Sequence, residues 1–225
     1  MFVDTHAHLD FDVYNDDREK VIQRAIENQV LAIITIGTDL ETSKQAILLA
    51  DKYASIYAAV GIHPSDCANA KPADFDFIKE LAGHEKVVAI GEIGLDYYHM
   101  HADKETQAKA FKQQIDIARE LNLPIIVHNR DSHTDMMEML KQENAGEIGG
   151  VMHSFSGDLA FLREIISMNL HLSFTGNITF KKSTSGELVK RAPIENLLLE
   201  TDSPFLTPVP LRGKRNEPAF IVHTA

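Results

Sequence analysis

The sequence predicts an α/β protein of the (β/α)8 type, a TIM barrel. Short apolar runs rich in β-branched residues alternate with longer segments of helical period along all 225 residues. Strands that alternate with helices and read as continuous apolar runs form parallel sheets covered by helices. Eight such runs are present, which is the number that closes a parallel barrel. The first run leads into His6, Ala7 and His8 rather than a Gly-rich phosphate turn, which argues against an open dinucleotide-binding sheet.

The expected strands are short and span the whole chain. They occupy residues 2–4, 31–36, 56–60, 87–90, 124–127, 150–152, 171–174 and 197–199. Most are rich in valine, isoleucine, leucine or phenylalanine, as strands buried on both faces require.

The expected helices lie between these strands. They occupy residues 16–28, 40–53, 73–83, 104–121, 131–143, 158–168 and 185–191. The segment 104–121 has the clearest pattern, because Ala108, Phe111, Ile115 and Ala118 recur at steps of three and four residues. This spacing lines one face of a helix with apolar side chains.

The end of the chain is irregular for a barrel. A complete barrel needs a helix after its eighth strand, yet few residues follow Asp202. Glu217 and Pro218 are typical of a helix start, with proline at the first helical position. We therefore expect most of the last helix to be missing, either because a C-terminal segment has been lost or because a partner chain covers the exposed barrel face.

Composition is that of an ordinary globular protein, with 44% hydrophobic and 24% charged residues, and predicts one domain over residues 1–225. A net charge of −11 argues against a generally basic surface for nucleic acid, although metal ions can offset this field locally. The longest apolar run, residues 30–36, is far shorter than the ~18 residues of a membrane span. The lone Cys67 agrees with a reducing compartment, so we expect a cytoplasmic location and no membrane partner.

Polar side chains follow nearly every expected strand. In chain order they are Thr5, His6 and His8; His63; Glu92 and Asp96; His128, Asn129 and Arg130; His153; Asn177; and Glu200, Thr201 and Asp202. All strands of a parallel barrel end at the same mouth, which is where barrel enzymes keep their chemistry. We therefore expect these residues to converge, although they are spread over most of the chain.

Several of these side chains have the chemistry of metal ligands. His6 and His8 point to the same face of a strand, since side chains alternate with period two. We expect four histidines and two carboxylates to serve as ligands at the mouth. So many ionisable groups at one mouth are best explained by a divalent cation, and imidazole with carboxylate suits Zn²⁺, Mn²⁺ or Fe²⁺ better than Ca²⁺. The set exceeds the needs of one tetrahedral ion, so we expect two ions bridged by a carboxylate.

Seven sequence blocks, each beside an expected strand end, carry a family resemblance. They are DTHAHLD at 4–10, GIHP at 61–64, GEIGLDYY at 91–98, HNRD at 128–131, HSFSG at 153–157, ETDSP at 200–204 and RGKRNEP at 212–218. In these blocks and their order the chain resembles the TatD family of metal-dependent deoxyribonucleases, within the wider amidohydrolase-like barrels. The resemblance implies a phosphodiester hydrolase acting on DNA, as a 3′–5′ exonuclease on single-stranded ends, with two divalent ions such as Mg²⁺, Mn²⁺ or Zn²⁺.

The resemblance also implies roles for the candidate ligands. It assigns His6, His8, Glu92 and Asp202 to a first ion, and Glu92, His128 and His153 to a second. Glu92 would then bridge the two ions. Asp202 would act as the general base that orients and deprotonates the attacking water. Glu92 and Asp202 are thus the expected catalytic residues.

Further residues beside the mouth are candidates for binding substrate. They are His63, Arg130, Lys181 and Arg212. His63 could donate to a substrate phosphate or pack against Pro64, and Arg130 could clamp a phosphate or pair with Asp131. The two loop cations could form a basic rim along a nucleic-acid backbone or simply be solvated.

Two other functions stay open at this point. A small-molecule hydrolase of the same barrel class, cleaving an amide, lactone or ester, predicts a closed pocket without a basic groove. A catalytically weak metal-binding scaffold is favoured if the missing terminal helix leaves the barrel inactive. DNA is the expected partner, and the sequence predicts no particular oligomeric state.

Overall fold

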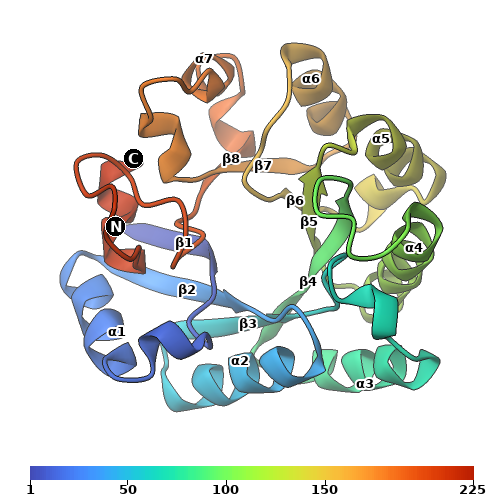
Figure 1. The fold of residues 1–225 in the computed structure, drawn as a ribbon, viewed down its shortest axis with the longest axis horizontal. Helices are drawn as coiled ribbons and strands as arrows, with labels where there is room; N and C mark the ends of the chain where they lie inside the picture. The colour runs from blue at the N-terminus through green and yellow to red at the C-terminus, as the bar shows by residue number, and fades with distance from the viewer.

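Eight parallel strands surround the centre of the computed structural model, which describes residues 1–225 (Figure 1). They are β1 Phe2–Ala7, β2 Val30–Ile36, β3 Ile56–Val60, β4 Val87–Asp96, β5 Ile125–Arg130, β6 Gly150–Met152, β7 His171–Phe174 and β8 Leu197–Leu199. Each strand pairs in parallel with the next in chain order. The predicted TIM barrel and all eight of its strands are confirmed.

The barrel closes through the residues that follow β8. The Asp202 N–H donates to the His6 carbonyl at 2.9 Å, and the His8 N–H donates to the Ser203 carbonyl at 2.8 Å. The Thr5 hydroxyl adds a bond to the Leu199 carbonyl at 3.0 Å. Because backbone groups buried in a barrel must be paired, this closure fixes Asp202 beside the end of β1.

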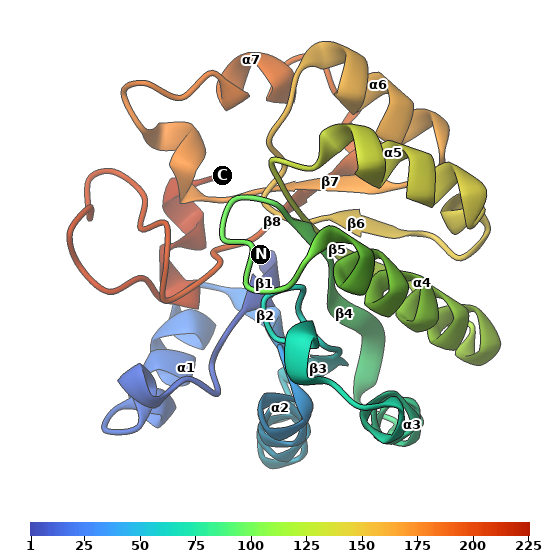
Figure 2. The same ribbon diagram turned by 45° about the vertical axis from the view of Figure 1, so that its right-hand side comes forward.

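Seven helices form a ring outside the strands (Figures 1 and 2). They are α1 Arg18–Glu27, α2 Leu40–Lys52, α3 Pro72–Ala82, α4 Lys104–Leu121, α5 His133–Gln142, α6 Leu159–Ser167 and α7 Ser185–Val189. The apolar face predicted for α4 is directed inward, with Phe111, Ile115 and Ala118 buried. The expected start of α5 at Asp131 is wrong, because Asp131 has φ of 54° and lies outside the helical region.

Three strands are longer than their apolar runs. Pairing of β4 with β5 continues from Gly94 opposite His128 to Asp96 opposite Arg130, so the polar residues there lie within strands rather than after them. Gly94 permits this close pairing, since it has φ of 143° and a Cβ on it would lie 2.0 Å from the His128 carbonyl oxygen. Similarly, β1 runs through His6 to Ala7. The polar strand ends are therefore held rigidly by the sheet.

Two apolar clusters support this arrangement. The larger, of 43 buried residues, includes side chains from Ala7 to Ile221. The smaller one takes a buried side chain from each of five strands: Ile36, Ala59, Ala89, Ile126 and Val151. Ile126 lies two residues before His128 and so on the same face of β5. This cluster therefore lies next to His128 on the inner face of that strand.

The chain after β8 packs back onto the beginning of the barrel. The predicted start at Glu217 and Pro218 is confirmed, but it opens a short 3-10 helix, Pro218–His223, whose Ile221 is buried. Arg24 of α1 donates twice to the carboxylate of Glu217, at 2.7 and 2.6 Å. Arg215 likewise donates twice to Asp17, at 2.8 and 2.7 Å. No helix is long and apolar enough to cross a membrane.

We predict that Arg24→Met lowers the free energy of unfolding by about 2 kcal/mol, because it leaves the buried carboxylate of Glu217 without its partner. Urea unfolding followed by circular dichroism measures this change. The double variant Arg24→Met/Glu217→Gln removes the unpaired charge and should recover part of the loss. A double variant no more stable than the single one would contradict this explanation.

Candidate metal centre

Two histidines and two carboxylates meet where β1, β4 and the chain after β8 come together. The Nε2 atoms of His6 and His8 are 3.3 Å apart. Oε2 of Glu92 lies 3.4 Å from His6 Nε2 and 3.9 Å from His8 Nε2. Oδ1 of Asp202 lies 3.9 and 3.6 Å from the same two nitrogens. The four side chains thus direct one donor atom each into a common space.

The other oxygen of Glu92 faces a second group of histidines. Its Oε1 lies 2.7 Å from His128 Nδ1, 3.7 Å from His153 Nε2 and 3.7 Å from His63 Nε2. The ring of His153 also stacks on that of His6, with centroids 3.6 Å apart. Glu92 therefore lies between two sets of imidazoles and directs a different oxygen to each.

His63 lies deeper in this cluster than a rim residue would. From the sequence we predicted His63 only as a phosphate contact or a packing residue. Its donor atom groups with those of Glu92 and His128 within 4.8 Å, which makes it a further candidate ligand. The role of His63 in binding phosphate stays a prediction.

Both carboxylates of the cluster favour the ionised form. Burial opposes ionisation of Glu92, but His153 and His6 hold the pKa of this carboxyl well below its ordinary value. Burial also acts against ionisation of Asp202, while the nearby imidazoles of His8 and His153 lower its pKa. Neither carboxylate has a lysine or arginine within ion-pair distance. Imidazole and carboxylate donors without a neighbouring lysine or arginine fit a divalent metal ion.

The histidines differ in their electrostatic surroundings. Burial lowers the pKa of His63 to about 3, so this imidazole is neutral. Its Nδ1 accepts from the Ser65 N–H at 3.0 Å, which leaves the ring proton on Nε2, the nitrogen that faces Glu92. Burial would lower the pKa of His153 too, but the carboxylates of Glu200 and Glu92 raise it to about 10. His153 is therefore held between two acidic side chains.

A set of carboxylates behind the cluster orients its members. Glu200 Oε1 lies 2.9 Å from His153 Nδ1, and Glu200 also accepts from the Ser173 hydroxyl at 2.6 Å. Asp96 Oδ2 lies 3.3 Å from His128 Nε2. Such carboxylate contacts fix the ring orientation of metal-binding histidines. Glu200 was not predicted from the sequence to orient a ligand, although its position two residues before Asp202 was a signal.

Two buried glutamines on α4, neither of them predicted from the sequence, fix the backbone next to these residues. Gln114 accepts from the Ile62 N–H at 2.7 Å and donates to the Ile62 carbonyl at 3.0 Å, directly before His63. Gln107 makes the same pair of bonds to Asp96, at 2.7 and 2.9 Å. They are seven residues apart and so share one helix face. This repeat on the buried face was the signal that could have identified them.

The four candidate substrate residues lie around the mouth at different distances from the cluster. His63 and Arg130 line a cavity of about 640 Å³ together with Glu92. Arg130 stacks over the Tyr98 ring at 4.9 Å and makes no ion pair with Asp131. Lys181 and Arg212 line an adjacent cavity of about 520 Å³, and Asn177 belongs to both cavities. Arg212 packs over the Phe180 ring at 3.7 Å.

Comparison with known proteins agrees with this geometry. A family model described as TatD related DNase matches residues 3–225. The chain belongs to the TatD family. An uncharacterized metal-dependent hydrolase, YabD of Bacillus subtilis, is 48% identical over 226 residues, covering 100% of this chain and 89% of that protein. The predicted family and the class of metal-dependent hydrolase are thus confirmed.

Two further TatD proteins are similar over nearly the whole chain. The protein named 3′–5′ ssDNA/RNA exonuclease TatD of Shigella flexneri is 35% identical over 226 residues, covering 98% of this chain and 87% of that protein. The crystal structure of YJJV, a TatD homolog from Escherichia coli K12, superposes with a TM-score of 0.90 at 31% identity, covering 98% of this chain and 86% of that one. The TatD barrel fold is therefore shared along the chain.

We predict that Gln114→Leu lowers the free energy of unfolding by about 2 kcal/mol, because the buried N–H and carbonyl of Ile62 lose their partners. Gln113→Leu is the matched control, since Gln113 is the adjacent residue on α4 and is not buried. Chemical denaturation of both variants measures the difference. Equal stabilities would show that the Gln114 bonds contribute nothing measurable.

We predict that Glu92→Gln loses most of its bound metal, because a neutral amide is a much weaker ligand than a carboxylate. Metal content after dialysis, measured by plasma mass spectrometry, tests this. Glu187→Gln on the exposed surface of α7 should keep the wild-type content. If a folded Glu92→Gln variant retains as much metal as the wild type, Glu92 is not a central ligand.

Proposed function

We propose that the protein is a phosphodiesterase that uses two divalent ions to shorten single-stranded DNA from its 3′ end. The observation that carries this proposal is the position of Glu92, whose two oxygens face different groups of histidines at 3.4 and 2.7 Å. A carboxylate in this position can bridge two ions in the manner that serves phosphodiester hydrolysis. The name of the Shigella relative supports the substrate class and the polarity.

In this proposal His6, His8, Glu92 and Asp202 hold one ion, and Glu92, His128 and His153 hold the other. The bound ions, Mg²⁺, Mn²⁺ or Zn²⁺, would polarise the phosphodiester and lower the pKa of a bound water. The proposed ligands come from nearly the whole barrel, from His6 on β1 to Asp202 after β8. Residues 1–225 would therefore act as one domain. The cytoplasmic location stays a prediction.

The protein side chains have separate tasks in the proposed reaction. Asp202, ionised and mostly buried, would accept the proton of the attacking water. His63 and Arg130 would donate hydrogen bonds to the phosphate, and Lys181 and Arg212 would contact the backbone beyond it. Glu200 and Asp96 would keep the rings of His153 and His128 in place.

The shape and charge of the barrel mouth favour a polymeric substrate over a small molecule. A closed pocket without a basic groove was expected for an amide, lactone or ester hydrolase. Instead, Arg130 is exposed at the rim of the central cavity, and Lys181 and Arg212 follow next to Asn177 without an acidic partner within ion-pair distance. Together these cations offer a path for a phosphate backbone on a protein whose net charge is negative.

We predict that the protein with Mg²⁺ or Mn²⁺ shortens a 5′-labelled single-stranded oligonucleotide stepwise, and that a chelator stops the reaction because the ions are removed. Asp202→Asn should lower kcat by about 100-fold or more, as expected for the loss of a general base. Asp51→Asn, on the outside of α2, is the control and should behave like the wild type. Persistence of the oligonucleotide with Mg²⁺, Mn²⁺ and Zn²⁺ would contradict the proposal.

A further inference from the structure

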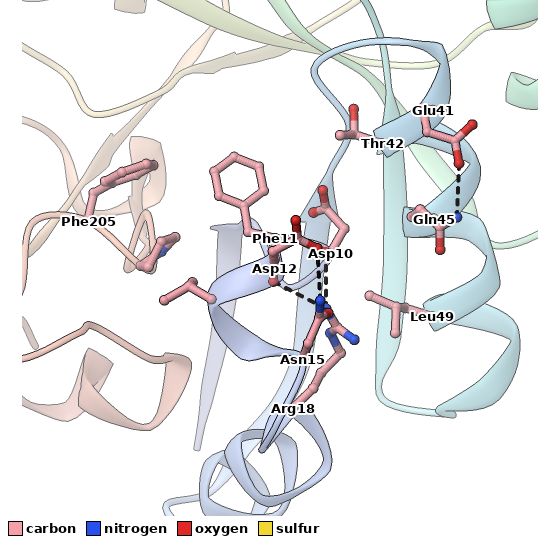
Figure 3. A pocket seen from close by; sticks show the side chains of 12 residues that line it. Asp10, Phe11, Asp12, Asn15, Arg18, Glu41, Thr42, Gln45, Leu49 and Phe205 are labelled. Atoms are coloured by element: carbon pink, nitrogen blue, oxygen red, sulfur yellow. Dashed lines mark hydrogen bonds between the residues drawn. The ribbon is translucent and has the colours of Figure 1, made fainter.

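A second cavity, of about 840 Å³, lies next to the metal centre on the side of α1 and α2 (Figure 3). Two phenylalanines, Phe11 and Phe205, line both this cavity and the central one. Their ring centroids are 6.1 Å apart with an angle of 80° between the planes. The ring of Phe11 also stacks on His8, at 4.7 Å. The second cavity therefore begins one aromatic side chain away from the candidate metal ligands.

The charge of this cavity does not suit a phosphate. Three carboxylates line it, those of Asp10, Asp12 and Glu41, against a single cation, Arg18. The guanidinium of Arg18 is already engaged, because it donates to the carbonyls of Leu9, Asp10 and Phe11 at 2.5, 3.0 and 3.2 Å. The cations suited to a phosphate backbone lie elsewhere on the mouth, in the cavity of Lys181 and Arg212.

The remaining lining suits a flat, neutral group that donates hydrogen bonds. Leu49 and the two phenylalanine rings provide apolar surface, and Gln45 provides an amide (Figure 3). The carboxylates of Asp10, Asp12 and Glu41 along its wall are hydrogen-bond acceptors. Phe205 is 50% exposed, which leaves its ring available for stacking. A nucleobase has this combination of a planar face and N–H groups at its edge.

We propose that this cavity, lined by Phe11, Phe205, Asp10, Gln45 and Leu49, is a nucleobase subsite. The base of a nucleotide next to the cleaved phosphate would stack on Phe205 and enter it, while the backbone continues towards Lys181 and Arg212. This inference rests on the proposed nuclease function and adds to it a contact that reads the base rather than the phosphate. If the cavity binds this base, the protein should cleave a normal 3′ end more efficiently than an end with an abasic residue.

Oligonucleotides with an abasic residue at one of the last positions of the 3′ end test the subsite. Base stacking on an aromatic side chain changes affinity by about tenfold or more. We expect wild-type kcat/KM to fall by about tenfold for one abasic position. Phe205→Ala should lose about tenfold on the normal oligonucleotide and show no further loss on the abasic one. Gln45→Trp, which fills the cavity from the exposed face of α2, should behave in the same way.

Matched substitutions outside the cavity serve as controls. Phe77→Ala on α3 removes a phenylalanine of similar exposure, 51%, and Lys44→Trp adds the same bulk beside Gln45 on α2. Both should keep the wild-type preference for a normal end. Wild-type cleavage that ignores every abasic position, or full discrimination by both cavity variants, would overturn the subsite while leaving the nuclease function intact. Failure of the wild type to cleave any oligonucleotide would contradict the proposed function and the subsite together.

Discussion

The two oxygens of Glu92 face different groups of histidines, and much of the barrel serves to hold this one carboxylate between them. It comes from β4, whose pairing with β5 also fixes His128. The closing hydrogen bonds of the barrel hold Asp202 against β1 and thereby against His6. A change in the register of any of these strands would move a donor atom out of the cluster.

This arrangement is electrostatically costly without a cation. Glu92 and Asp202 are buried, ionised and without a lysine or arginine partner, so imidazoles alone compensate them. Removing charges from water costs several kcal/mol per ion unless they are paired. Divalent ions would provide that compensation, and the cluster would then carry the chemistry of a TatD-type metal-dependent hydrolase. The supporting contacts of Glu200 and Asp96 indicate that the rings are oriented in advance.

The sequence predicted the barrel because its signal is local. Apolar runs, helical periods and polar residues at strand ends can all be read within short windows, which is why the members of the cluster around Glu92 were named together. The predicted strand ends were less accurate, because β4 continues through Glu92 and Asp96 by pairing with β5, whose residues lie more than thirty positions further along the chain. Long-range contacts were missed for the same reason. The bonds of Gln114 to Ile62, and of Arg24 to Glu217, join residues far apart in the chain.

Anomalous X-ray diffraction from crystals of the protein containing Mn²⁺ tests the central claim most directly. We predict two anomalous peaks, one on each side of the Glu92 carboxylate and roughly 3.5 to 4 Å apart. One peak should lie within bonding distance of His6 and His8, and the other of His128 and His153. A single peak, or peaks that do not contact Glu92, would contradict the bridging role on which the proposed function rests.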